Sequence, residues 1–263
     1  MIAGHNAGII AGNRRRSSGG NVPDANTLYL FSGKTLESMT DGDEITLWED
    51  QSSLGNDAYK LETASNPVKS TQDGLACSYH DGDTTNARVL ALDYLSDYWI
   101  GTGNMTWECH VKLLSSPPVS QYPIHISDTI DSKTLSCFHR INSASSSRYQ
   151  PRWTYNGSNI VYRAINNTTS GIEFGTGDWY HIAQVRNGTT FKVYVNGTEI
   201  SSNNVSEDAI YPHGGVGIGG VYIASTGAVV ANQCLKGYLD RVKFSNVARY
   251  TSSGFTPPER DDL

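Results

Sequence analysis

The most regular pattern in the chain is an alternation of apolar and polar side chains over residues 105–113. A period of two is typical of a β-strand with one face in the core and the other in water. We therefore predict a half-buried strand here. Cys109 falls on the apolar face and is expected to be a small buried side chain, whereas His110 falls on the face expected to be exposed.

Two hairpins are predicted further along the chain. Alternating runs at residues 179–186 and 191–195 are followed by Asn187 and Asn196, and each asparagine precedes a glycine. Asn-Gly after such a run is a strong hairpin signal, because both turn positions tolerate positive φ. Two such signals in succession predict a β-meander.

Other segments extend the same picture. Residues 27–31, 45–48 and 238–244 are candidate strands, and the prolines at 257–258 end the fold because proline cannot continue a ladder. No long segment shows helical spacing of apolar residues. The chain also shows no internal repeat and no second core. These patterns predict one all-β domain over residues 25–263.

Residues 1–24 differ in composition from everything that follows. They are small and polar-basic, and they include Arg14, Arg15 and Arg16. Such a segment buries too little apolar surface to fold alone. Two interpretations remain: an anchoring arm whose arginines lie along the acidic surface of a neighbouring subunit, or a solvated flexible tail. We favour the assembly arm.

The net charge of the chain limits the kinds of molecule that it is expected to bind. The 263 residues carry 20 Lys and Arg against 26 Asp and Glu, a formal net charge of −6. An acidic body lacks the electrostatic footprint of a nucleic-acid-binding protein. No apolar stretch approaches the roughly 20 residues of a membrane span, and the N-terminus lacks the pattern of a secretory signal. We expect neither nucleic acid nor a membrane as partner.

Several of these segments together resemble a known family. Residues 178–188 read DWYHIAQVRNG, residues 191–197 read FKVYVNG and residues 236–242 read KGYLDRV. They are similar to motifs of the laminin G-like domains in the concanavalin A-like lectin/glucanase superfamily. Residues 41–58 resemble the opening of such domains, and residues 246–258 resemble the tail of phage-encoded members.

The resemblance covers about residues 25–258 and none of the arm. It implies a two-sheet antiparallel jelly-roll sandwich, to which the sequence adds an extended N-terminal arm. It says less about function, because this fold hosts lectins, adhesins, hydrolases and structural modules.

Catalysis is the first function to test, because some superfamily members cleave glucans. Retaining glycosidases need two carboxyl groups about 5–5.5 Å apart, which the family places on one strand as Glu-x-Asp-x-Glu. That motif is absent from the sequence, and the cluster of Asp41, Asp43 and Glu44 lies in a turn with the wrong spacing. His181 and Asp240 match family positions and are expected to be structural hydrogen-bonding groups. We predict that the protein is not an enzyme.

Metal binding is the next candidate chemistry. The acidic loops at residues 41–43 and 81–83 each hold two aspartates around a glycine, and Ca²⁺ takes about six to eight oxygen ligands. Neither loop completes an EF-hand, and Asp-Gly marks ordinary turns, which is the favoured interpretation. A structural calcium remains open with no ligand assigned, and no other cofactor is expected.

Glycan binding would need exposed aromatic rings beside polar groups. The candidates are Trp153, Tyr155, Tyr122 and Tyr211. Trp153 and Tyr155 alternate on one predicted strand. The competing interpretation is that these rings belong to the core, where large aromatic side chains contribute most.

These observations favour a bacteriophage virion structural protein. The arm would attach it to capsid or tail proteins, and the sandwich would be displayed on the particle surface as a capsid decoration, head fibre or tail appendage. Many copies would make weak binding to cell-surface glycans effective. A free carbohydrate-binding adhesin is the alternative hypothesis, and a glycoside hydrolase is a third.

Overall fold

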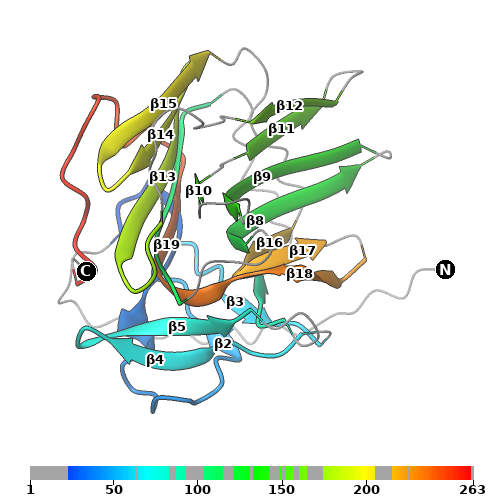
Figure 1. The fold of residues 1–263 in the computed structure, drawn as a ribbon, viewed down its shortest axis with the longest axis vertical. Coiled ribbons are helices and arrows are strands. Elements are labelled where there is room, and N and C mark those ends of the chain that lie inside the picture. The colour runs from blue at the N-terminus through cyan, green and yellow to red at the C-terminus, as the bar shows by residue number, and fades with distance from the viewer. Residues whose placement is uncertain are drawn as a thin grey trace.

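The protein is a β-sandwich. The computed structural model describes residues 23–62, 64–82, 87–92, 103–114, 121–130, 133–142, 148–149, 152–156, 160–164, 174–204, 215–223 and 226–261. Within these residues lie nineteen strands and one 3₁₀ helix, η1 (Gly33–Leu36). Figure 1 shows the strands gathered into two main layers that face each other. The predicted all-β fold is confirmed.

The first sheet contains the N-terminal and C-terminal strands of the sandwich. Its order is β15-β14-β13-β7-β19-β5-β4, and β1 pairs with β19. The bounds are β1 (Thr27–Phe31), β4 (Val68–Gln72), β5 (Leu75–Asp81), β7 (Met105–Leu113), β13 (Trp179–Asn187), β14 (Thr190–Val195), β15 (Thr198–Asn204) and β19 (Lys236–Ser245). Every pairing in it is antiparallel.

The second sheet lies opposite, in the order β12-β11-β9-β8-β16-β6-β3-β2, with β10 on β9. The bounds are β2 (Leu47–Trp48), β3 (Ala58–Lys60), β6 (Leu90–Leu92), β8 (Gln121–Ile130), β9 (Lys133–Asn142), β10 (Arg148–Tyr149), β11 (Arg152–Asn156), β12 (Ile160–Ala164) and β16 (Gly215–Ile218). A separate hairpin, β17 (Gly220–Ile223) with β18 (Ala228–Cys234), packs against it: Val221 contacts Tyr122, and Tyr222 joins Val89 and Ala91.

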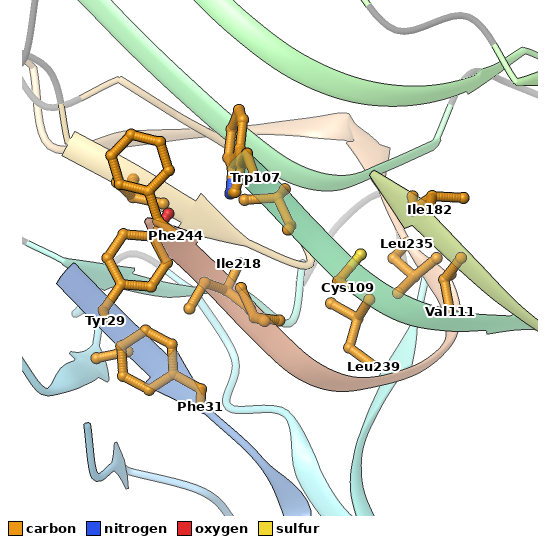
Figure 2. Packing of buried hydrophobic residues seen from close by; sticks show 14 of the residues in the cluster. Tyr29, Phe31, Trp107, Cys109, Val111, Ile182, Ile218, Leu235, Leu239 and Phe244 are labelled. Atoms are coloured by element: carbon orange, nitrogen blue, oxygen red, sulfur yellow. The ribbon is translucent and has the colours of Figure 1, made fainter. Parts of the chain in front are cut away.

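The space between the sheets is filled by aromatic and aliphatic side chains. Tyr29 stacks on Phe31 at 5.4 Å and on Phe244 at 5.6 Å between ring centroids, and Trp107 meets Phe244 edge-on. Figure 2 shows these rings next to one another, with Cys109 further along the same strand as Trp107. Cys109 is free and fully buried, so the prediction of a small core side chain is confirmed.

The predicted hairpins are present, with one change in the turn. In the β14–β15 hairpin, Asn196 and Gly197 are the two turn residues and both have positive φ, as predicted. In the β13–β14 hairpin Asn187 still pairs with Thr190, so the turn is formed by the next two residues. The glycine at position 188 supplies the positive φ there, and Asn187 stays in the strand.

Residues 50–57, within the segment that resembles the opening of the family's domains, form a network of hydrogen bonds with one another and with β1. The Asp50 carboxylate is buried and accepts hydrogen bonds from the amides of Leu30, Ser52 and Asn56, each at 2.8 Å. The Asp57 carboxylate in turn accepts the amide of Asp50. Because a buried carboxylate is costly without such partners, the motif acts by fixing this loop to β1.

The prediction that the polar face of β7 is wet is wrong. Thr106, Glu108 and His110 are all buried. The reason is the C-terminal segment, residues 246–261, which runs over the face of the first sheet that points away from the core (Figure 1). We call that face the outer face. Tyr250 and Phe255 of the segment pack on it with the side chains of β13 and β14.

Candidate functional site

The outer face of the first sheet carries the densest polar chemistry that the structure describes. It divides into two parts. The buried cluster consists of Glu108, His110, His181 and Tyr250 and lies under the C-terminal segment. The aromatic row consists of Trp179, Lys112, Tyr238 and Tyr79 and runs across four neighbouring strands.

The buried cluster is centred on Glu108. Its carboxylate lies 2.9 Å from Nε2 of His181, and Tyr250 Oη donates to the same oxygen at 2.6 Å. Burial alone would raise the pKa of Glu108, but its hydrogen bond and electrostatic interaction with His181, the charge of Lys243 and the hydrogen bond from Tyr250 together lower that pKa to about 2. Glu108 therefore stays ionised.

Aromatic rings of the C-terminal segment cover the buried cluster on the side away from the sheet. Tyr250 stacks on Phe255 with centroids 3.6 Å apart, and both rings meet His181 edge-on. His110 lies with its ring centroid 5.0 Å from that of His181, and burial holds the pKa of His110 well below its usual value. His110 was predicted to be exposed, and that prediction is wrong. His181 is the hydrogen-bonded structural histidine that the sequence predicts.

Asp240 is likewise a structural acceptor, as predicted. It accepts the amides of Gly33 and Arg241 at 2.8 Å each and Nε of Arg260 at 3.0 Å. A β-bulge lies here in β19, and Arg241 has a φ of +49°. The Arg241 guanidinium donates to the carbonyl of Glu259, so both residues of the bulge hold the C-terminal segment down.

The aromatic row is set by strand register. Trp179 of β13 is opposite Lys112 of β7, Lys112 is opposite Tyr238 of β19, and Tyr238 is opposite Tyr79 of β5. Directly paired residues share a face of the sheet, so all four side chains emerge on the outer face. Each of the four residues is partly exposed.

The rings of the row are close together and are not parallel. The centroids of Trp179 and Tyr238 are 6.4 Å apart with planes at 45°, and those of Tyr238 and Tyr79 are 5.3 Å apart at 40°. Trp179 Nε1 donates to Asp73 at 2.8 Å, and the Arg260 guanidinium lies 3.8 Å over the Trp179 ring. The hydrogen bond from Trp179, followed by the charge of Lys112, lowers the pKa of Asp73.

The acidic loops are engaged by basic side chains. Asp41 pairs with Lys69 and accepts the Thr71 hydroxyl, and Asp81 accepts Nε of Arg88 at 2.5 Å. Gly42 and Gly82 both have positive φ, as Asp-Gly turns require. No cluster of three or more His, Cys, Asp or Glu in the described ranges has the arrangement of a metal site. Asp41 and Asp81 are partners of Lys69 and Arg88, whereas the second aspartate of the later loop, Asp83, lies outside the described residues.

The structure describes the residues predicted for glycan binding only in part. Trp153 and Tyr155 lie in β11, where Trp153 pairs with Cys137 of β9. Tyr122 is only 7% exposed and its ring meets His125 edge-on. Tyr211 lies outside the described residues, as do Arg14, Arg15 and Arg16. The arm and this glycan site stay predictions.

The family is now decided by comparison with known sequences. A sequence model of the concanavalin A-like lectin/glucanases superfamily matches residues 81–252, more than half of the chain. The chain belongs to this superfamily. No curated protein sequence matches it.

Solved structures agree with membership of the concanavalin A-like superfamily. Domain 4 of AbnA, an extracellular arabinanase from Geobacillus stearothermophilus, in complex with arabinotriose, has a TM-score of 0.56 at 11% identity, over 85% of this chain and 93% of that one. The binding domain of Paraclostridial Mosquitocidal Protein 1 has a TM-score of 0.55 at 11% identity, covering 86% and 50%. Trypanosoma rangeli sialidase in complex with sialic acid has a TM-score of 0.53 at 16% identity, covering 87% and 32%.

The chain thus spans about half of the mosquitocidal protein structure and about a third of the sialidase. At these identities the likeness shows a shared fold. It assigns no ligand of this superfamily to the present chain.

Sequence reasoning missed the aromatic row. The signal that could have found it is the inward and outward alternation along each strand. Lys112, Tyr238 and Tyr79 each lie between buried residues of their own strands. This alternation does not show which outward residues become neighbours, because the register between strands that are distant in sequence is set by the whole fold. In this superfamily member the row joins strands separated by more than 150 positions, as in the contact of Ser78 with Leu239.

Proposed function

We propose that the chain is a non-catalytic, lectin-type binding domain displayed on the surface of a bacteriophage particle. One observation supports the proposal that the domain binds a ligand without catalysing a reaction. On the outer face of the first sheet the buried carboxylates are held in structural hydrogen bonds, whereas partly exposed aromatic rings remain in a row beside them.

The carboxylates argue for binding over hydrolysis. A general acid or nucleophile must reach the glycosidic bond of a substrate. Glu108 and Asp240 lie beneath the C-terminal segment, and Asp50 is closed off by three backbone amides. The oxygen atoms of each of these three carboxylates accept hydrogen bonds from other parts of the protein, which stabilise the fold.

The similar structures support a carbohydrate ligand. The arabinanase domain is a separate domain of its enzyme, and its structure holds arabinotriose. The mosquitocidal protein contributes a binding domain. A sandwich of this fold is thus used for binding apart from catalysis, which is the role that we propose here.

The proposal that the protein lies on the surface of a bacteriophage particle rests on the sequence. Residues 246–258 resemble the tail of phage-encoded superfamily members, and residues 1–24 have the basic, core-free composition of an attachment arm. In this proposal capsid or tail proteins are the partners of the arm, and many copies on one particle turn weak glycan contacts into useful avidity.

Two experiments test the two parts separately. The full chain and a variant that starts at Val22 are compared for incorporation into particles that lack the protein, with circular dichroism as the folding control. We expect loss of incorporation with the sandwich still folded. Equal incorporation would refute the arm as anchor, and glycan binding by a free, unincorporated protein would favour the adhesin hypothesis.

The second experiment incubates the full chain with soluble oligosaccharides and measures both binding and product formation. Binding without hydrolysis is the expected result. Release of shorter sugars would overturn the non-catalytic assignment.

A further inference from the structure

The outer face of the first sheet is covered unevenly. The C-terminal segment buries Glu108, His110 and His181, but the next row of side chains towards the end of the sheet stays partly exposed. That row holds Trp179, Tyr238 and Tyr79. Three large rings side by side on a solvent-facing sheet surface are unusual enough to need an explanation, since aromatic side chains contribute most when buried.

We propose that the aromatic row is the glycan-binding surface of this domain and that its ligand is a single neutral oligosaccharide chain. The proposal rests on the proposed lectin-type function and names its site and its ligand class. The surface differs from the four residues that the sequence suggested.

The spacing of the rings suits a chain of sugars. Pyranose rings present apolar C–H faces that pack on aromatic rings, while their hydroxyl groups need polar partners at the edge. Here rings follow one another at 6.4 and 5.3 Å, Lys112 lies within the row, and Asp73 and Arg88 lie at its edges. Neighbouring rings can therefore contact successive sugar units while these polar groups meet the hydroxyls.

The rings are also held in place before any ligand arrives. Trp179 is fixed by its hydrogen bond to Asp73 and by the Arg260 guanidinium on its ring. The Tyr238 ring has the rings of Trp179 and Tyr79 as neighbours on its two sides. A surface whose rings are already ordered loses less conformational entropy on binding, which favours affinity from a small contact area. Arg260 covers part of Trp179, and the Arg88 guanidinium lies 6.0 Å from the centroid of the Tyr79 ring, so a ligand would contact the parts of the rings that stay exposed.

The tilt of the rings selects the form of the ligand. Successive planes differ by 45° and 40°. A flat crystalline polysaccharide surface would touch only one such ring at a time. A single soluble chain can bend to contact rings that are tilted relative to one another.

The charges of the row select a neutral ligand. Lys112 lies 3.5 Å from Asp73, Arg88 pairs with Asp81, and Arg260 pairs with Asp240. Each of these three cations is thus matched by a carboxylate. An acidic chain would therefore find no unpaired positive charge among these three side chains.

The test uses single substitutions in the full chain. Tyr79→Ala and Tyr238→Ala remove the rings, and Tyr79→Phe and Tyr238→Phe keep them. Tyr59→Ala is the matched control, because Tyr59 is a partly exposed tyrosine on β3 of the second sheet. Circular dichroism and urea unfolding confirm that each variant is folded.

Binding is measured by isothermal titration calorimetry with arabinotriose, cellohexaose, chitohexaose and, as the acidic probe, a galacturonic acid hexamer. We expect at least one neutral probe to bind, each alanine variant to lose about tenfold in affinity, and the phenylalanine variants and Tyr59→Ala to stay within about twofold. The acidic probe should bind more weakly than the neutral ones.

Three results would overturn the proposal in different ways. Unchanged affinity in both alanine variants would place the site elsewhere and leave the lectin-type function standing. Preference for the galacturonic acid hexamer would refute the neutral ligand class. Absence of binding to every probe by the unmodified chain would remove both this site and the proposed glycan-binding function.

Discussion

The buried cluster predicts a pH-dependent contribution to stability that a single substitution removes. Glu108→Gln keeps the size of the side chain and its capacity to accept hydrogen bonds, but it removes the charge that His181 and Tyr250 stabilise. The ordinary pKa of a glutamate is 4.5, and that of Glu108 is about 2. Since each tenfold difference in acidity corresponds to about 1.4 kcal/mol, the folded state gains up to about 3 kcal/mol from this carboxylate at neutral pH.

The sign of the pH dependence follows from the lowered pKa. A carboxyl group that is more acidic in the folded state stabilises the fold fully above its unfolded pKa of 4.5. It loses that contribution as the pH falls through about 2. The free energy of unfolding of Glu108→Gln should therefore lie about 2–3 kcal/mol below that of the unmodified chain at pH 7. The gap should narrow steadily below pH 4.5.

Urea unfolding at a series of pH values, followed by circular dichroism, measures this gap. Glu37→Gln is the control, because Glu37 forms an exposed pair with Lys34 at 3.4 Å and such pairs are worth little. We expect the control to stay within about 0.5 kcal/mol of the unmodified chain. A gap for Glu108→Gln that is equally small, or one of constant size from pH 7 to pH 3, would refute the reasoning.

Three further substitutions test the packing. Trp107→Ala should lower the free energy of unfolding by about 3–5 kcal/mol, measured by urea unfolding, because it leaves a cavity between the sheets. Gly219→Ala should destabilise by about 1–3 kcal/mol in the same assay, since φ is +84° and the new Cβ would lie 2.0 Å from Nδ1 of His80; an unchanged midpoint would contradict that close approach. Tyr250→Phe should cost about 1–2 kcal/mol at pH 7, and a double-mutant cycle with Glu108→Gln should show coupling, whereas strict additivity would argue against their hydrogen bond.

The strands were predictable because they depend on local alternation. β7 has the bounds that its period of two indicates, and β1 likewise matches its predicted residues. The exposure of the outward residues was not predictable in the same way. Glu108 and His110 follow the pattern of a wet face, but residues more than 130 positions later in the chain cover them.

The candidate site shows the same limit more strongly. Each member of the aromatic row can be recognised as an outward residue of a strand, yet the row exists only because β13, β7, β19 and β5 are neighbours in that order. The predicted choice of Trp153 and Tyr155 rested on two residues of one strand, which sequence does reveal. A surface made by four strands requires the register between them.

The pairing of β1 with β19 has a consequence for how the chain is made. Asp24, just before β1, bonds Arg249, 225 positions later, so the first strand of the sandwich docks against a part of the chain that is synthesised long after it. At translation rates of roughly 5–20 residues per second, β1 waits roughly 10 to 45 s for its partner. During that time the apolar sequence TLYLF has no native neighbour on β19. Until β19 is made, β1 is therefore an unpaired apolar strand of the kind that promotes aggregation in a growing chain.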